Sequence, residues 1–368
     1  VTISESGIEA SGIGITCANI NGTQIGGRRN LIINGAMQVA QRSTSETGLG
    51  AAAGYFTLDR FRTTFSNTTG RVTMAQVADV HDGFANAMKF TCTTADTSIA
   101  SDEYFILQYK FEGQDVQLLK KGSSDAEEFT VSFYVKGNAS ATYVVEMYDL
   151  DNNRQVGKTF SVTTSWARVV LTFPADTTGA FGDDNAASLQ LGIWLHAGSN
   201  YTSGTLATSW VSNVSAQRAG GITSFFDSTD RTFFLTGLQL EVGSQATPFE
   251  HRSAGEEIKL CMRYCQKIFN AQLIGTMNTS SRMRIMANFT VPMRGTPSYT
   301  RTSNSFSFQK AASNETSSDT TEAQGGNTAT ADGNSYARTW DFGGFSSLAD
   351  RTFIGGNGGH VFTLDAEL

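Results

Sequence analysis

The stretch "ASLQLGIWLHAGS" (residues 187–199) decides the fold class of this chain. Every second residue in it is apolar, and the residues between are polar, small or aromatic. The apolar set is Leu189, Leu191, Ile193 and Leu195, and the alternating set is Gln190, Gly192, Trp194 and His196. A period of two predicts a β-strand with one face buried and the other turned outward, as in antiparallel sheets.

The same period recurs along the chain. It is found in "EEFTVSFYVKG" (127–137), "SWARVVLTFPAD" (165–176) and "RTFFLTGLQLEVGS" (231–244). The stretch "TYVVEMYDLDNNRQVGKTFSV" (142–162) predicts two strands joined by a turn at Asp151–Asn153. Short strands separated by turns rich in Gly, Asn and Asp, without regular helix–strand alternation, favour a mainly β protein, an antiparallel jelly-roll β-sandwich.

Composition excludes several classes of function. Of the 368 residues, 39% are hydrophobic and only 17% are charged, and the net charge of −7 is spread without a long run of either sign. A nucleic-acid-binding protein would show a basic face, so no nucleic-acid partner is expected. No stretch approaches the roughly 20 apolar residues that cross a bilayer, so no membrane insertion is expected.

We divide the chain into four segments. Residues 1–30 are an extended N-terminal stem, too poor in apolar residues to form a core, and either a docking segment stabilised by other copies of the chain or a flexible leader. Residues 31–250 are the sandwich. Residues 251–270 are a linking helix, and residues 271–368 are a smaller C-terminal β domain in which residues 317–337 are interpreted as an exposed loop.

Two local patterns mark the ends of the sandwich. "RNLIINGAMQVAQR" (29–42) predicts a first strand followed by a turn with positive φ at Asn34–Gly35. In "HRSAGEEIKLCMRYCQKIFN" (251–270), Ser253 is the expected N-cap with Glu256 as its capping-box partner. Cys261 and Cys265 fall on the apolar face of this helix, which favours buried free thiols of a reducing compartment over a metal site.

Five stretches resemble virion structural proteins of tailed phages, of the tail-fibre or fibre-like type. They are "RNLIINGAMQVAQRS" (29–43), "FTLDRFR" (56–62), "SWARVVLTFPADTTG" (165–179), "FFLTGLQLEVGSQATPFEHRSAGEEIKLCMRYCQKI" (233–268) and "FTLDAEL" (362–368). The resemblance covers residues 10–270 well and weakens over 270–350. It implies a jelly roll like that of carbohydrate-binding modules, attached to a virion-docking N-terminus.

Catalytic and cofactor motifs are not evident in the sequence, and we expect no enzyme, no cofactor and no metal. The four histidines, His81, His196, His251 and His360, are far apart in the sequence and match no metal or triad spacing, so surface or capping roles are expected. "DLDNNRQ" (149–155) has the shape of a calcium loop but lacks the Gly and distal Glu of an EF-hand. A polysaccharide depolymerase would need two carboxylates at a set separation, and nothing in the sequence brings two together.

The candidate glycan-binding residues are those on the strands that point away from the apolar stripe. They are Tyr134, Glu146, Trp194 and His196. Aromatic rings stack on the C–H faces of sugars, and Glu and His hydrogen-bond to hydroxyl groups. The alternative is that a second layer of the protein covers Trp194.

The function expected from these observations is that of a phage virion structural protein, assembled in the host cytoplasm. It would be homo-oligomeric, as a homotrimer, would contact other virion proteins through the stem, and would attach to host-surface polysaccharide by multivalent, non-catalytic binding. The alternatives are a capsid decoration or tail adaptor without a ligand, a polysaccharide depolymerase and, more distantly, a bacterial adhesin.

Overall fold

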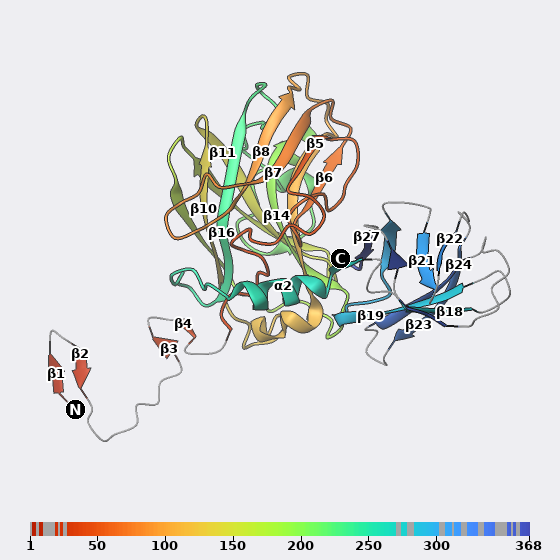
Figure 1. The fold of residues 1–368 in the computed structure, drawn as a ribbon. Helices are drawn as coiled ribbons and strands as arrows, with labels where there is room; N and C mark the ends of the chain where they lie inside the picture. Colours follow the sequence, from red (N-terminus) through yellow and green to blue (C-terminus); the bar gives the residue numbers. More distant parts are fainter. Residues whose placement is uncertain are drawn as a thin grey trace.

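The computed structural model describes residues 28–268, 288–298, 300 and 362–368 in full, and outside these ranges we use only the bounds and pairing of strands. Two six-stranded sheets face each other and form the body of the molecule (Figure 1). Every pairing within them is antiparallel. The expected mainly β, antiparallel sandwich is therefore confirmed.

The first sheet, here the β10 sheet, has the order β13-β10-β16-β8-β7-β5. Its strands are β5 (Ser45–Leu49), β7 (Arg71–Val77), β8 (Ala87–Thr94), β10 (Phe129–Gly137), β13 (Ala167–Phe173) and β16 (Thr232–Val242). The second, here the β14 sheet, has the order β15-β12-β11-β14-β9-β6. Its strands are β6 (Arg62–Ser66), β9 (Tyr104–Glu112), β11 (Ala141–Asp149), β12 (Arg154–Val162), β14 (Ala187–Ala197) and β15 (Val211–Ser212).

The core between the sheets is made by the predicted alternation. Phe133 and Val135 of β10 and Leu191 and Ile193 of β14 are each at most 1% exposed and belong to one hydrophobic cluster. The predicted hairpin is also present, because β11 pairs with β12 in register from Ala141–Val162 to Asp149–Arg154. Burial of these side chains supplies most of the stabilisation, at about 25 cal/mol per Å² of apolar surface.

Residues 29–42 form a largely buried irregular segment, not the expected strand. Residues 31–33 are not assigned to a strand, yet Ile32 is fully buried and Leu31 N donates to Leu240 O at 3.0 Å. The predicted turn is confirmed, with Asn34 at φ 63°. Gly35 is required by space, since a Cβ there would lie 2.1 Å from Leu238 O. The chain is tied down from Arg29 onward, because Glu250 Oε2 accepts from Arg29 N at 3.0 Å and from Asn30 N at 2.6 Å.

The linking helix is shorter than predicted. Helix α2 spans Ala254–Met262, begins at the predicted Ser253 N-cap and has the predicted capping box with Glu256. Cys265–Phe269, expected to continue the helix, is strand β17, which pairs with β27 (Val361–Asp365). The partner strand comes from nearly a hundred residues later, so local periodicity could not reveal it. Cys92, Cys261 and Cys265 are free and buried, as expected.

The remaining described elements are short helical turns and the strands of both terminal segments. The turns are η1 (Gly113–Asp115), η2 (Gln117–Leu119), α1 (Ser199–Thr202) and η3 (Ser215–Gln217). The N-terminal strands are β1 (Thr2–Ser4), β2 (Gly7–Glu9), β3 (Asn19–Ile20) and β4 (Thr23–Gln24). The C-terminal strands are β18 (Ile274–Met277), β19 (Met283–Met293), β20 (Ser298–Arg301), β21 (Phe306–Lys310), β22 (Ser313–Ser317), β23 (Glu322–Ala329), β24 (Ser335–Phe342), β25 (Thr352–Ile354) and β26 (Gly356–Asn357).

Two predictions concern these terminal segments. The segment 317–337, expected to be a loop, contains β23 and the start of β24, because a polar sequence can still pair through its backbone. The stem interpretation of residues 1–30 lies outside the fully described residues, apart from 28–30. Within the part of the chain that the structure describes, no helix is long and apolar enough to cross a membrane.

The C-terminal tail returns to the lower end of the sandwich, where α2 also lies (Figure 1). Arg60 is 1% exposed, and its Nη1 lies 2.5 Å from Glu367 Oε2. The Arg60 guanidinium also stacks on Tyr264, with Cζ 3.5 Å from the ring centroid. Arg42 Nη2 lies 2.7 Å from Asp365 Oδ2, and Tyr55 Oη donates to Leu368 O. The tail is thus held by two arginines of the sandwich.

We expect Glu367→Gln to lower the free energy of unfolding by about 3–5 kcal/mol, because it leaves the buried Arg60 charge unpaired. The control is Glu127→Gln, which breaks an exposed pair with Lys120, where both side chains are at least 40% exposed. That change is expected to leave the free energy of unfolding almost unchanged, because water and salt screen an exposed pair. Chemical denaturation of both variants measures the difference, and equal costs would show that the tail does not anchor the fold.

Candidate functional site

The four predicted glycan-binding residues do not share one face. Tyr134 lies on β10, while Glu146 lies on β11 and Trp194 and His196 on β14, in the opposite sheet. Tyr134, Glu146 and Trp194 point away from the core between the sheets, as the alternation predicts. His196 does not follow the alternation, because the register shifts between Trp194 and His196 and its ring packs against Phe226 of the main core. The sequence left open whether these strands adjoin, since strand order cannot be obtained from the alternation within single strands, and the structure separates Tyr134 from the other three.

Trp194 is fully buried on the outer side of the β14 sheet. Its Nε1 donates to Glu146 Oε2 at 3.0 Å, and the same carboxylate accepts from Arg218 Nε and Nη2, both at 2.7 Å. The Arg218 guanidinium lies over the Trp194 ring, 4.9 Å from its centroid. The indole and the carboxylate are thus satisfied by the protein itself.

The segment between β14 and β16 covers these residues. Tyr201, Leu206 and Ile222 pack with Trp194 in a small hydrophobic cluster separate from the main core. The segment is pinned to the sheet by backbone hydrogen bonds, among them Thr223 N to Thr142 O at 2.8 Å. The alternative of a covering layer therefore describes this face, which presents neither the Trp194 ring nor the Glu146 carboxylate to a ligand.

His196 is also fully buried, beside the edge of the same cover. Its Nδ1 lies 2.8 Å from Ser224 Oγ and its Nε2 lies 3.2 Å from Glu103 Oε2, with the Phe226 ring packed against it. Burial lowers the pKa of His196, although Glu103 and Asp96 oppose that shift by favouring the charged form. The imidazole is therefore a packed structural group that resists protonation.

This lowered pKa makes stability depend on pH. The unfolded chain binds a proton at His196 as the pH falls below about 6.5, whereas the folded chain does so only at lower pH. Stability from this group is therefore present above about pH 6.5 and is lost as the pH falls toward the folded pKa.

The free energy of unfolding is expected to fall between about pH 7.5 and pH 5, and we expect this fall to be smaller in the His196→Gln variant than in the unmodified chain. The control is His251→Gln, at an exposed histidine; equal losses in all three proteins would contradict the assignment.

Tyr134 lies in a different setting, a half-buried aromatic cluster on the outer side of the β10 sheet. We call this cluster, made of His81, Phe84, Tyr134, Phe249 and His251, the aromatic patch. The His81 ring stacks on Tyr134 with centroids 4.1 Å apart, and Phe84 lies 5.5 Å from Tyr134. Phe249 and His251 lie 5.1 and 5.3 Å from Phe84. His251 is exposed, and the other four are partly exposed.

A glycine makes room for the rings of the patch. Gly237 has φ 62°, and a Cβ there would lie 2.6 Å from Phe84 Cζ and 3.0 Å from a ring carbon of Tyr134. It sits beside a register shift between Ser132 and Tyr134, where β10 pairs with β16. The absent side chain lets two aromatic rings lie close to the sheet surface, a use of glycine that matches its role where groups approach the backbone.

Charged and aromatic groups border the patch on the same sheet. Arg168, opposite Tyr134 on β13, places its guanidinium 6.0 Å from the Tyr134 ring centroid. Lys136 binds Asp79 at 2.7 Å and lies over the half-buried Trp166 ring at 5.3 Å. Partly exposed rings beside hydrogen-bonding groups are what a saccharide needs, stacking for its C–H face and partners for its hydroxyls.

Sequence reasoning found one member of the patch and missed the rest. Tyr134 follows from the strand period, but Phe84 and Phe249 lie in loops, where no period marks a side chain's direction. His81 and His251 match no motif and were expected to have surface or capping roles, and no local pattern joins two residues that are 170 positions apart. The positive-φ Gly237 inside a strand pattern was the one local signal, since such a glycine marks close approach.

The suspected calcium loop at 149–155 is occupied by a lysine. Lys121 is almost fully buried, and its Nζ lies 2.5 Å from Asp149 Oδ2 and 3.1 Å from Asp176 Oδ2. The same ammonium donates to the carbonyls of Thr178 and Gly179, both at 2.7 Å. These oxygens neutralise and solvate an internal cation. Among the fully described residues, no group of His, Cys, Asp or Glu side chains is arranged to hold a metal ion.

Three carboxylates that a depolymerase could in principle use as catalytic groups have structural partners. Glu146 is paired with Arg218, and Asp149 with Lys121. Glu241 is buried and accepts from Gln239 Nε2 and Thr247 N. A general acid and a nucleophile of a glycosidase must both face the scissile bond. These three carboxylates instead neutralise or hydrogen-bond groups of the fold.

Comparison with solved structures gives neighbours that include carbohydrate-binding modules. A family 4 carbohydrate-binding module is 13% identical over 57% of this chain and 97% of its own, with a TM-score of 0.30. A family 61 module in complex with β-1,4-galactotriose is 11% identical over 58% and 99%, also with a TM-score of 0.30. The xylan-binding family 22 module of Paenibacillus barcinonensis Xyn10C is 12% identical over 60% and 100%, with the same TM-score.

No family model and no curated protein matches the chain. At this identity and TM-score the fold rests on the chain's own strand pairings, and the functional argument rests on its own side chains.

Proposed function

We propose that this chain is a non-catalytic glycan-attachment protein of a tailed-phage virion, a tail fibre or fibre-like appendage. The observation that carries glycan binding is the aromatic patch, in which the Tyr134 and Phe84 rings lie partly exposed on an outer sheet face. The virion role is supported by the resemblance of five stretches of the sequence to such proteins. The chain would act as a homo-oligomer, a trimer, joined to other virion proteins through residues 1–30.

Four of the five resembling stretches meet at the lower end of the sandwich, which supports treating these four as one structural unit. Asp59 and Arg60 of "FTLDRFR" contact the first, fourth and fifth stretches. Gln41 N donates to Asp59 Oδ1 at 2.9 Å, Arg60 stacks on Tyr264, and Arg60 pairs with Glu367. These residues therefore build the lower end of the sandwich and leave the outer face of the β10 sheet for recognition.

Attachment through the patch implies weak single sites used together. A half-exposed aromatic cluster without a deep cleft buries little of a saccharide, so each site alone would bind weakly. Several copies on one particle convert the later binding events into intramolecular ones, which raises the overall avidity by about 10²–10⁴. Oligomerisation is thus part of the proposed mechanism.

We expect Tyr134→Ala to lower binding to the receptor glycan by about tenfold or more per site, because a sugar-stacking ring is lost. Labelled protein is titrated onto a panel of bacterial strains, with and without periodate oxidation of their surface glycans. Tyr148→Ala is the matched control, a partly exposed tyrosine of the opposite sheet.

Trp194→Ala is expected to lower the free energy of unfolding by about 3–5 kcal/mol, because it leaves a cavity under the covering segment. Chemical denaturation measures this loss.

The same titration separates the alternatives. Binding that survives both periodate and Tyr134→Ala would argue against glycan attachment at the patch. An intact oligomer that binds no strain would favour a capsid decoration or tail adaptor without a ligand. Release of reducing sugar from the cell surface would identify a depolymerase.

We also expect deletion of residues 1–27 to convert the oligomer to a monomer, because the proposed stem would lose the contacts between copies. The deletion leaves the anchoring bonds of Arg29 and Asn30 to Glu250 in place, so the sandwich keeps its fold. Light scattering measures the mass, and an unchanged melting temperature serves as the folding control. An unchanged oligomeric mass would place the contacts between copies elsewhere in the chain.

A further inference from the structure

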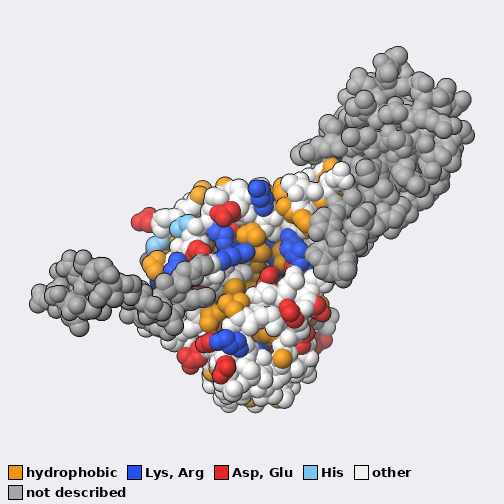
Figure 2. Space-filling model, turned by 90° about the horizontal axis from the view of Figure 1, so that it is seen from below, with side chains coloured by type: hydrophobic (Ala, Val, Ile, Leu, Met, Phe, Trp, Pro, Cys, Tyr) orange, Lys and Arg blue, Asp and Glu red, His pale blue; other side chains and the backbone are white. Residues whose placement is uncertain are grey.

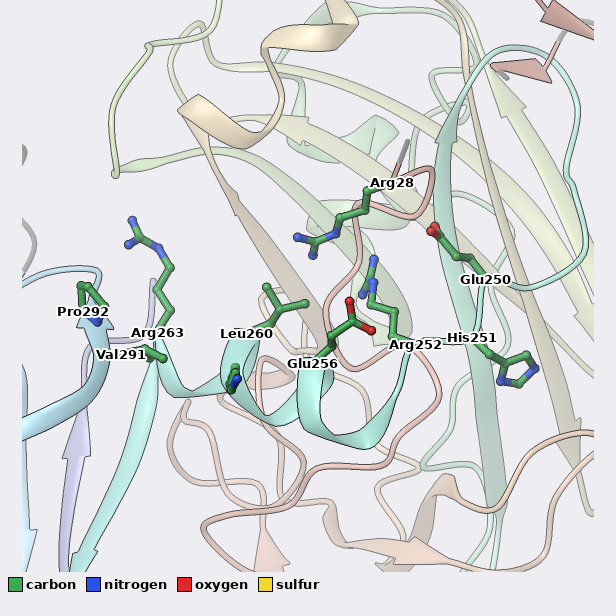
Figure 3. Close-up of a pocket in the computed structure, with 10 residues that line it drawn as sticks. Arg28, Glu250, His251, Arg252, Glu256, Leu260, Arg263, Val291 and Pro292 are labelled. Atoms are coloured by element: carbon green, nitrogen blue, oxygen red, sulfur yellow. The ribbon is translucent and has the colours of Figure 1, made fainter. Parts of the chain in front are cut away.

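A cavity of about 740 Å³ lies beneath the sandwich, beside helix α2 (Figure 3). Its lining comes from the residues before the sandwich, from α2 with its flanks, and from the end of β19. The lining residues are Arg28, Glu250, His251, Arg252, Glu256, Lys259, Leu260, Arg263, Val291 and Pro292. A volume of this size is typical of small-molecule sites.

Positive charge dominates this lining. Four of its residues are arginine or lysine and two are glutamate. Figure 2, which views this end of the molecule, shows Lys and Arg side chains gathered around an apolar strip. Arg252 is paired with Glu257 at 3.3 Å and Arg263 with Glu112 at 2.6 Å, so the positive charge available to a ligand is that of Arg28 and Lys259.

Two of the cations are held in place by the fold. Arg252 is 7% exposed and donates from Nη1 to Ile32 O at 2.9 Å and from Nη2 to Asn30 O. Its Nε is buried and has no hydrogen-bond partner. Arg263 is held by Glu112, with Nε 2.7 Å from Oε1 and Nη2 2.6 Å from Oε2. These contacts fix both guanidinium groups in the wall of the cavity.

The other two cations are uncommitted. Among the fully described residues, Arg28 and Lys259 form no ion pair, and both are exposed. Arg28 is held at the cavity because the next two residues are anchored through their backbone to Glu250. Figure 3 shows the Arg28 and Arg252 guanidinium groups near each other above α2. Two like charges placed together favour an anion between them.

The rest of the lining limits the kind of anion. The Glu250 and Glu256 carboxylates would repel a multiply charged phosphate but accept hydrogen bonds from hydroxyls. Leu260, Val291 and Pro292 provide an apolar wall that fits the C–H face of a sugar ring. His251 belongs both to this lining and to the aromatic patch, which connects the two sites.

We propose that the cavity binds the carboxylate of an acidic sugar, a uronate or a sialate, within a polysaccharide that also crosses the aromatic patch. This inference rests on the proposed glycan attachment and specifies its ligand as an acidic polymer. Arg28 and Lys259 contact the carboxylate, and Glu250 accepts from neighbouring hydroxyls.

The test uses the full chain and three acidic oligosaccharides, from polygalacturonate, polysialate and hyaluronan, each beside its carboxyl-reduced form. We expect calorimetry to give at least one acidic oligomer an affinity about tenfold or more above that of its reduced form. Arg28→Gln combined with Lys259→Gln is expected to remove that difference and leave the reduced form's affinity unchanged. Arg29→Gln is the matched control, because Arg29 follows Arg28 in the sequence but does not line the cavity.

Each other outcome overturns the inference. Equal affinity for every acidic oligomer and its reduced form would exclude carboxylate recognition, as would acid-selective binding that survives the double substitution. Saturable binding of inorganic phosphate without any acid-selective sugar binding would make the cavity a simple anion site. Equal binding of the acidic and reduced forms that Tyr134→Ala abolishes would preserve glycan attachment while this inference falls. Unchanged melting temperatures of the variants ensure that a loss of binding is not a loss of fold.

Discussion

The buried ion pair between Arg60 and Glu367 is the interaction on which the lower end of the structure depends. Arg60 adopts φ 74° and is enclosed by Tyr109, Tyr264 and the C-terminal tail, so its charge has no access to water. Removing two such charges from water costs several kcal/mol, which only close pairing and further hydrogen bonds offset. The Arg60 Nη2 bond to Lys110 O at 2.6 Å is one of these. The last residues of the chain are therefore required to complete the sandwich.

The outer faces of the two sheets differ in how far they are covered by other parts of the chain. Over the β14 sheet, residues 198–223 form a second layer that buries Trp194 and Glu146. The β10 sheet carries a patch of half-exposed rings, and Gly237 leaves room for them. The difference arises from the connections: the segment from β14 to β16 is long enough to fold back over its sheet. The face with the most conspicuous aromatic residue in the sequence is consequently the closed one.

His251 belongs both to the aromatic patch and to the lining of the cavity beside α2. It lies close to the point where residues 28–30 enter the sandwich. Glu250 holds the backbone of Arg29 and Asn30, and the next residue in sequence contacts both sites. The anchoring that fixes the fold thus also positions Arg28 beside the cavity. Rigid placement of this kind lowers the entropy lost when a flexible polymer binds.

The sequence by itself determined what depends on neighbours along the chain: strands from the period of two, the hairpin at residues 151–153, the Asn34 turn and the Ser253 cap. These follow from side-chain direction and backbone preference within a few residues. Only the tertiary structure decided what depends on distant partners. It placed Tyr134 in the opposite sheet from Trp194, turned residues 265–269 into a strand, and brought His81 beside Tyr134. The physical reason is that strand order and loop packing are set by burial summed over the whole molecule, which no local window contains.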